Sequence, residues 1–396
     1  MLSCKDIYLI EPDLLNYNGH TYNYVKSIYN ESQKSEINFN VLTSINCEDK
    51  ILSEIPCNVV FQNRPSDKVF SNLFLRFFIA PIIYNLFLFR GLFKAKKELN
   101  FNSDTTLFMS TMQHLHGFAL YFFIKLYNPS YAPKLILFLR LSLNRIDLNR
   151  RTSTFIWYKI LFFLFDKIDK KYSIKYVTDS ILLKDEFEKY FNIHVEILPI
   201  PHINISEEKE INYKKIIFTS MGSARKSKGF GIIVEAITKL KNNPIFHNLY
   251  FILQCNHSEE DTNIKNMVTL LKSFSLNNLD LIEKNLNEND YQKLLNCSDV
   301  VLIPYDKAIY HSNTSGIFTE AVGAGKPVIV TKNTWMSYYL DKASGIEIEY
   351  NSESLSRAII KMANDYIDYK KYAYIQKNEW IKYHNPNNFF SILTSV

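Results

Sequence analysis

The residues best suited to chemistry in this chain lie in two short segments of its second half. The first, Gly222-Ser-Ala-Arg-Lys-Ser-Lys-Gly229, leaves an expected strand and opens an expected helix. Its glycines permit a tight backbone, and its three cations suit a diphosphate held at the carboxyl end of a strand. It is neither a Walker loop nor the dinucleotide fingerprint G-x-G-x-x-G. A basic surface turn is the alternative explanation.

The second segment, Ser312 to Thr331, combines a polar turn, a short helix and a buried strand. Ser315 and Gly316 are expected at the helix start, where backbone N–H groups have no acceptor within the helix. Glu320 follows about one turn later. The helix start suits phosphate and the carboxylate suits ribose or sugar hydroxyls, so the segment favours a sugar nucleotide as ligand. A capped helix with one solvated Glu is the alternative.

Short apolar runs alternate with helical-period stretches along the chain, which is typical of α/β architecture. Expected strands are 7–10, 40–43, 59–61, 106–110, 135–139 and 175–178 in the first half, and 216–219, 250–254, 279–282, 300–303 and 326–331 in the second. Helices are expected after Gly229 and at 290–296, 316–324, 353–365 and 367–384.

A chain of 396 residues is too long for one ordinary core, so we expect two domains. The best linker candidate runs from the prolines near 195–201 to the polar segment 206–210. The expected division is an acceptor-binding domain at 1–205, a nucleotide-sugar-binding domain at 206–376 and a final helix, 377–396, that packs back on the first domain.

These segments resemble the donor half of the family 4 glycosyltransferases, the glycosyl transferases group 1, which are retaining enzymes of the GT-B class. That family pairs a Gly…Lys-Gly loop with a Glu-x7-Glu segment that runs into Ala-x-x-x-Gly-x-Pro-Val. The positions that match in order and spacing are Gly222, Lys228, Gly229, Glu320, Ala321, Gly325, Pro327 and Val328. The resemblance implies an α/β chain of GT-B fold, with two Rossmann-like domains facing each other across a cleft.

The resemblance also implies roles for individual residues. Lys228 with Arg225 would hold the donor diphosphate, and Glu320 would hold the ribose hydroxyls. In the first half, Gly19 and His20 resemble the Gly-rich turn after the first strand. His116, or less convincingly His114, resembles the active-site histidine. Further donor contacts fall on Gly222, Ser312, Thr314, Ser315, Gly316 and Ile317.

Two positions depart from the family pattern, because Ser312 stands where the family has its first Glu and Ser223 where it has Arg. We expect a retaining glycosyltransferase of the hexosyltransferase type. It would move a sugar from a nucleoside diphosphate to a hydroxyl of a glycan or lipid-linked acceptor, in surface polysaccharide or glycolipid biosynthesis. The alternatives are a non-catalytic GT-B binding subunit, which Ser312 suggests, and a GT-B sugar-nucleotide epimerase.

The sequence contains no Asp-x-Asp, and its five cysteines form no C-x-x-C pair. We therefore expect no metal and no cofactor beyond the donor substrate itself, with Lys, Arg and a helix dipole neutralising the leaving group.

Positive charge is concentrated in the first half. Residues 51–175 hold 18 Lys and Arg against 7 Asp and Glu, a local excess of +11 compared with +6 for the whole chain. Aromatic-rich segments such as 155–165 are interleaved with these cations, and no nucleic-acid-binding motif is present. This pattern favours contact with an anionic membrane face over nucleic acid. A core helix with a solvated basic face is the alternative.

The apolar run Phe77–Phe89 is too short for a bilayer span, which needs about 20 residues. The stretch 6–10 is expected to be a first strand rather than a signal peptide. We thus expect a cytoplasmic protein that works at the inner face of the membrane.

Overall fold

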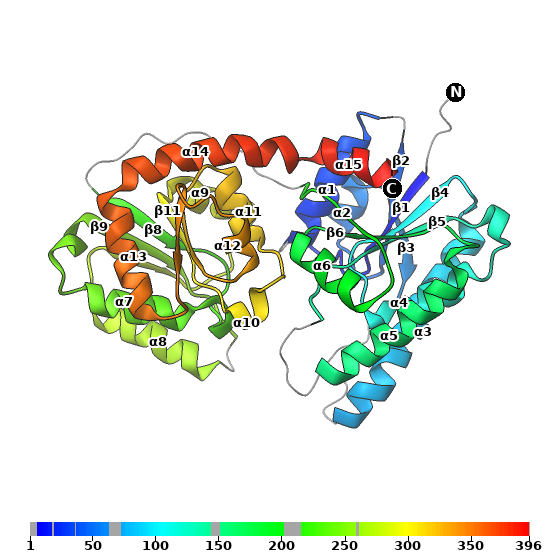
Figure 1. Cartoon of the computed structure of the whole chain (residues 1–396), viewed down its shortest axis with the longest axis horizontal. Coiled ribbons are helices and arrows are strands. Elements are labelled where there is room, and N and C mark those ends of the chain that lie inside the picture. The colour runs from blue at the N-terminus through cyan, green and yellow to red at the C-terminus, as the bar shows by residue number, and fades with distance from the viewer. Residues whose placement is uncertain are drawn as a thin grey trace. The chain divides into compact units, whose positions relative to one another are not determined.

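The computed structural model describes residues 6–17, 20–35, 37–62, 73–143, 151–201, 215–258 and 261–395. The chain forms two compact units (Figure 1). Unit 1 comprises Met1–His202 and Pro386–Val396, and unit 2 comprises Ile203–Asn385.

Unit 1 is built on a seven-stranded parallel sheet of order β3-β2-β1-β4-β5-β6-β7. Successive residues of its central strands point to opposite faces, as the period of a strand requires. In β5, Leu135 and Leu137 join one apolar core, whereas Ile136 and Phe138 join the other. Because both faces are covered, residues 135–138 of this central strand form a continuous apolar run rather than an alternating pattern. The strands are β1 (Asp6–Ile10), β2 (Asn38–Ser44), β3 (Cys57–Phe61), β4 (Thr105–Met109), β5 (Lys134–Phe138), β6 (Ile174–Thr178) and β7 (Val195–Ile197).

The helices of unit 1 cover both faces of this sheet. On one face pack α3 (Leu73–Glu98), α4 (His114–Ile124), α5 (Arg151–Asp169) and α6 (Ile181–Tyr190). On the other face pack α1 (His20–Ser32), α2 (Asp49–Glu54) and α15 (Pro386–Ser395). A short 3-10 helix, η2 (Pro129–Tyr131), precedes β5.

Unit 2 repeats the plan with a six-stranded parallel sheet of order β10-β9-β8-β11-β12-β13. Its strands are β8 (Ile216–Ser220), β9 (Leu249–Gln254), β10 (Leu279–Ile282), β11 (Val300–Ile303), β12 (Val328–Thr331) and β13 (Gly345–Ile348). Its helices are η3 (Lys226–Lys228), α7 (Phe230–Leu240), η4 (Pro244–Asn248), α8 (Thr262–Ser273), α9 (Glu288–Cys297), α10 (Lys307–Tyr310), α11 (Gly316–Gly323), α12 (Trp335–Tyr339), α13 (Ser352–Asn364) and α14 (Tyr366–Tyr383).

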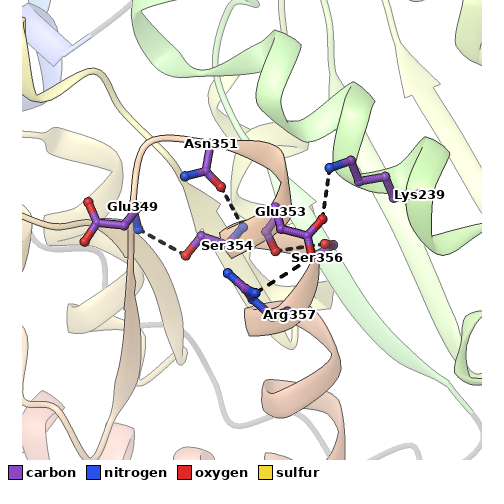
Figure 2. A network of polar contacts seen from close by, with 7 residues as sticks. All are labelled: Lys239, Glu349, Asn351, Glu353, Ser354, Ser356 and Arg357. Atoms are coloured by element: carbon purple, nitrogen blue, oxygen red, sulfur yellow. Dashed lines mark hydrogen bonds and ion pairs between the residues drawn. The ribbon is translucent and has the colours of Figure 1, made fainter.

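Helix α7, which follows the basic loop, is held against α13 by a buried apolar core and a polar network at the surface. Figure 2 shows Lys239 of α7 paired with Glu353 of α13 at 3.0 Å, beside the N-cap residue Asn351, which accepts a hydrogen bond from the Ser354 amide. Exposed pairs of this kind contribute little free energy. The buried side chains, such as Ile237 and Leu355, therefore carry most of the packing that places the start of α7.

The expected α/β class with two Rossmann-like domains is confirmed. Every strand expected from the sequence is present, and its ends lie within two residues of the expected ones. Two edge strands were missed. Val195–Ile197, expected in the linker, is β7, because it pairs with β6, and Gly345–Ile348 is β13. The polar segment 206–210 lies outside the described residues.

In place of the single helix expected at 377–396, the structure has the end of α14 and the separate helix α15, and the two belong to different units. Helix α14 stays with unit 2, where Trp380 packs against Phe318 and Trp335. Only α15 returns to unit 1, where Phe389 contacts the Tyr24 ring at a centroid distance of 5.8 Å. Aromatic packing on each side thus separates α14 from α15 after Asn385, compared with 376 expected. The other division between the units follows His202, compared with 205 expected.

Within the described residues, one helical stretch, Phe78–Glu98 of α3, is long and apolar enough to cross a membrane by length and composition. The sequence expectation ended this apolar run at Phe89, before Arg90, whereas the helix continues to Glu98. Of its most apolar 18-residue window, 44% is buried in the protein. The buried part packs on the sheet, so α3 serves the core of unit 1 with one face.

Candidate functional site

The topology of unit 2 places both sequence-predicted segments at one edge of its sheet. The chain winds outward from β8 to β9 and β10, then returns to β11 on the other side of β8. The loops that leave the carboxyl ends of β8 and β11 therefore diverge, and open α/β sheets bind ligands at such a switch point. The loop after β8 is the basic segment 221–229, and the loop after β11 leads into α11.

Two glycines shape the basic loop and admit the amine of Lys228. Gly222 has φ of +80° and Gly229 has φ of +71°, a left-handed conformation that glycine adopts without strain. A Cβ atom on Gly222 would lie 2.6 Å from Lys228 Nζ and 3.1 Å from Ile317 Cδ1. The Lys228 amine therefore rests against bare backbone, next to the first turn of α11.

The charges of this region lie close enough to perturb one another. Burial, together with the neighbouring Arg225, lowers the pKa of Lys228 to about 8, and Glu320 opposes the shift. Burial raises the pKa of Glu320 to about 7, against a hydrogen bond from Tyr291 that lowers it. The structure thus brings the predicted residues Arg225, Lys228 and Glu320 together. Arg225 is exposed and Lys228 is half-buried.

The start of α11 is capped as the sequence predicts. Ser315 has extended backbone, and its hydroxyl accepts a hydrogen bond from the Phe318 amide at 3.3 Å. The amides of Gly316 and Ile317 occupy the first turn, where no carbonyl of the helix can accept from them. Such a helix start favours an anion. Ser312 and Ser315 are buried, and Thr314 is half-buried.

Two residues of this site were missed by sequence reasoning. The hydroxyl of Tyr291, on α9, donates to Glu320 Oε2. Burial, together with the Glu320 charge, raises the pKa of Tyr291 well above 10, so this hydroxyl stays a donor. Gln254, the last residue of β9, accepts a hydrogen bond from the Gly222 amide at 2.6 Å. A polar residue that ends an apolar strand could have signalled Gln254, but nothing near Tyr291 in the sequence points to Glu320.

Unit 1 has a hollow of about 140 Å³ at the equivalent edge of its sheet, where β1, β4 and β5 end. His116, in the first turn of α4, lines it together with Glu11, Ser110, Thr111 and Arg140. Nδ1 of His116 lies 3.2 Å from the Thr111 carbonyl. Because a carbonyl only accepts, Nδ1 carries the hydrogen, and Nε2 is then the acceptor nitrogen of the neutral ring.

Glu11 and Arg140 are among the polar side chains of this hollow that the sequence did not single out. Burial raises the pKa of Glu11 to about 7, although the Ser110 hydroxyl donates to its carboxylate at 2.5 Å. The Arg140 guanidinium lies 4.3 Å from the ring centroids of both Tyr24 and Phe138. Glu11 directly follows β1, and Arg140 lies two residues after the end of β5. A charged residue just after a buried strand is therefore the sequence signal that could have identified both.

The other predicted residues of unit 1 contribute less. His114 packs against the Tyr158 ring, and burial lowers its pKa to about 4, so it is neutral at physiological pH. His114 does not line the hollow that contains His116. His20 is the first residue of α1, and Gly19 lies outside the described residues. Across the part of the chain that the structure describes, no three His, Cys, Asp or Glu residues form a group that could hold a metal ion.

Comparison with solved structures shows which fold this is. Sucrose-phosphate synthase from Thermosynechococcus elongatus superposes with a TM-score of 0.71 at 10% identity, covering 99% of this chain and 98% of that one. Anabaena Alr3699/HepE in complex with UDP and glucose gives a TM-score of 0.66 at 12% identity, with coverage of 99% and 98%. A glycosyltransferase from Rickettsia africae gives 0.67 at 15%, with coverage of 99% and 97%. The whole chain therefore has the GT-B fold.

No curated protein matches the sequence of this chain at a significant level. Residues 202–379 match the family model described as Glycosyl transferases group 1. This range spans nearly all of unit 2 and includes both segments that carry the candidate site. Unit 2 therefore matches the group 1 glycosyltransferases, within a chain whose fold is GT-B and whose similarities support a glycosyltransferase.

Proposed function

We propose that this glycosyltransferase moves a sugar from a nucleoside diphosphate to an acceptor hydroxyl, with retention of configuration and without a divalent metal. The observation that carries the proposal is the placement of Lys228, whose amine lies against Gly222 beside the first turn of α11. Lys228, Arg225 and the α11 amides supply positive charge where a donor diphosphate would lie. Glu320, buried near Lys228, suits the ribose hydroxyls.

The proposed chemistry needs no nucleophile from the protein. The bond between the anomeric carbon and the diphosphate oxygen breaks, and a new bond forms from that carbon to the acceptor oxygen. The proton of the acceptor hydroxyl passes to the departing diphosphate. Negative charge on the leaving group grows during this step. Fixed cations that stabilise this charge lower the barrier by about 3 kcal/mol. His116 is our candidate for a contact to the reacting sugar, through the acceptor nitrogen Nε2.

The acceptor is proposed to be a glycan or lipid-linked hydroxyl bound by unit 1, at the cytoplasmic face of a membrane. The polar hollow around His116 and Glu11 and the cationic character of residues 51–175 support this assignment. Surface polysaccharide or glycolipid synthesis would use such an acceptor. For the donor, UDP-glucose is the first candidate to test, because the similar Anabaena structure was solved in complex with it.

A thermal-shift panel of nucleotide diphosphate sugars in the presence of a chelator tests the donor part. We expect one nucleotide class to raise Tm, followed by turnover of that donor with a retained anomeric configuration in the product. Mass spectrometry and NMR of the product measure the transfer. Stabilisation or turnover that requires added magnesium or manganese would contradict the metal-free mechanism. The absence of any response to every nucleotide sugar would contradict the donor assignment.

A further inference from the structure

Helix α3 carries two apolar faces, and only one of them serves the core of unit 1. The buried face includes Ala80, Tyr84, Leu88, Leu92 and Ala95. The exposed face holds Leu75, Phe78, Ile82, Leu86 and Phe93, each between 40% and 52% exposed. Within each set, most neighbours are three or four positions apart, so each set follows one side of the helix. A surface helix needs only one apolar stripe to pack on a sheet, so the core of unit 1 does not account for the second, exposed stripe of α3.

The second stripe borders an apolar groove of about 620 Å³. Helices α3, α4 and α5 lie side by side on this face of unit 1 (Figure 1). The groove is lined by Ile82, Leu86, Phe89, Phe118, Phe122 and Trp157, with contributions from all three helices. Exposed Ile156, Ile160 and Phe163 extend the apolar surface along α5.

The single polar uncharged residue of the lining, Asn85, is already satisfied by protein groups. Its amide nitrogen donates to the carbonyls of Pro81 and His114, and its Oδ1 accepts from the Ala119 amide. The groove therefore offers apolar surface and no hydrogen-bonding site for a polar ligand at Asn85.

Lysine side chains lie along the border of this apolar surface. Lys125 lines the groove itself. The amine of Lys97 lies 4.7 Å from the Phe93 ring, and that of Lys167 lies 4.2 Å from the Phe163 ring. Cations outnumber acids on α3 and α5. Among the side chains that the structure describes there, six are Lys or Arg (Arg90, Lys94, Lys96, Lys97, Lys159, Lys167) and three are acids (Glu98, Asp166, Asp169). Cations beside exposed aromatic and aliphatic side chains match the headgroup region of an anionic bilayer.

We propose that the α3–α4–α5 groove is the surface by which this protein docks on an anionic lipid bilayer. The exposed apolar side chains enter the acyl boundary, and the lysines contact lipid phosphates. A second copy of the chain fits less well, because a two-fold pairing through this face would bring the same lysines towards one another. The inference rests on the proposed membrane-side localisation and names the surface responsible, but it depends on neither the donor site nor turnover.

Vesicle flotation with the full chain tests the proposal. We expect binding to vesicles containing phosphatidylglycerol, much weaker binding to pure phosphatidylcholine, and a loss of binding at about 1 M salt, where charges are screened within about 3 Å. Trp157 supplies a local reporter, since Trp335 and Trp380 are buried in unit 2. Lipids brominated on the acyl chain should quench the fluorescence of the wild type, and W157F should lose most of that quenching.

Matched variants identify the surface. The double variant I82Q/L86Q removes two groove residues that are 52% and 50% exposed. The control L270Q/I367Q changes residues of unit 2 that are 45% and 52% exposed. We expect the groove variant to lower the vesicle partition coefficient about tenfold or more, and the control to stay within about twofold. Circular dichroism melts and a nucleotide-sugar thermal shift check that both variants are folded.

Four results would overturn the proposal: no binding to anionic vesicles, equal binding to neutral vesicles, unchanged binding by I82Q/L86Q, or a dimer that the groove variant converts to monomer. None of these depends on the donor assignment. A protein that binds vesicles but no nucleotide sugar would contradict the donor assignment alone. A protein that binds the donor but no vesicles would contradict this inference and the proposed membrane-side location, and would leave the donor assignment standing.

Discussion

The Tyr291 hydroxyl donates a hydrogen bond to the Glu320 carboxylate, joining α9 to α11 across 29 positions of sequence. Because burial and the Glu320 charge keep the pKa of Tyr291 well above 10, this donor persists over the physiological range. The bond favours the ionised form of Glu320, whose pKa burial has raised to about 7. Tyr291 thus holds the carboxylate that we assign to the ribose, and we regard it as a positioning residue.

Replacement Tyr291→Phe should therefore raise the pKa of Glu320 further. A hydrogen bond to a charged group contributes about 1.5–3 kcal/mol, which corresponds to about one to two pH units. We expect the acid limb of kcat/KM for the donor to move to higher pH, with activity recovering towards the wild-type value at alkaline pH. Tyr250→Phe is the control, because it removes a similar hydrogen bond, to Asp280, at the edge of the same sheet. A loss of activity that is the same at every pH would contradict the positioning role.

The variant Lys228→Ala should lower kcat/KM by about 10² to 10³-fold, because it removes a cation from the growing charge of the leaving group. The control is Lys226→Ala, an exposed lysine of the same 3-10 helix, which should stay within about twofold. Steady-state kinetics of both variants, with melting curves to show folding, make the comparison. Equal effects of the two changes would mean that general positive charge, rather than the Lys228 position, matters.

Affinity for the nucleoside diphosphate should fall as the pH rises through about 8, the value to which burial lowers the pKa of Lys228. The protonated amine attracts the diphosphate and the neutral amine does not, so each further pH unit should weaken binding by up to about tenfold. Arginine keeps its charge in this range, so Lys228→Arg should remove the decline. Calorimetric titration with the nucleoside diphosphate from pH 6.5 to pH 9.5 measures this decline in affinity. A decline that persists in Lys228→Arg would mean that another group causes it.

The variant Gly222→Ala should weaken donor binding as well as stability. At φ of +80° a Cβ costs about 1–2 kcal/mol, and here it would also lie 2.6 Å from Lys228 Nζ and displace the amine. Gly231→Ala is the matched control, because its Cβ in α7 would meet only the flexible end of Met267, at 3.1 Å. We expect the control to be as stable as the wild type or more so, since alanine favours a helix. Differential scanning calorimetry and donor titration distinguish the two variants, and wild-type donor affinity in Gly222→Ala would be evidence against this account.

The carboxyl group of Glu11 should make unit 1 less stable at alkaline pH. Its pKa is raised in the folded state from 4.5 to about 7, so its stabilising contribution is complete below about pH 4.5 and is lost as the pH rises through 7. Glutamine carries no charge at any pH, so Glu11→Gln should gain stability relative to the wild type between pH 5 and pH 8. The difference in Tm between variant and wild type measures this gain, which should correspond to at most about 3 kcal/mol. Glu353→Gln, which changes an exposed carboxylate whose pKa Lys239 lowers, should show no such increase over this range. A flat difference for both variants would contradict the buried, protonated state of Glu11.

Local patterns were sufficient to predict the α/β class and most strands. Apolar runs such as Val300–Ile303 have few alternatives to a buried parallel strand, and Gly325 followed by Pro327 marks a helix end before a strand. The edge strands β7 and β13 escaped because an edge strand is short and only half-covered, so its sequence lacks the strong apolar signal of a central strand.

The cationic loop, the capped start of α11 and Glu320 could also be found in the sequence, because each depends on neighbours within a few positions. The partners Tyr291 and Gln254, the hollow that joins Glu11 to His116, and the second apolar face of α3 could not. These depend on the order of strands in each sheet and on which side of a helix the core covers. Both follow from packing between segments far apart in the chain, and no local pattern of residue types encodes that packing.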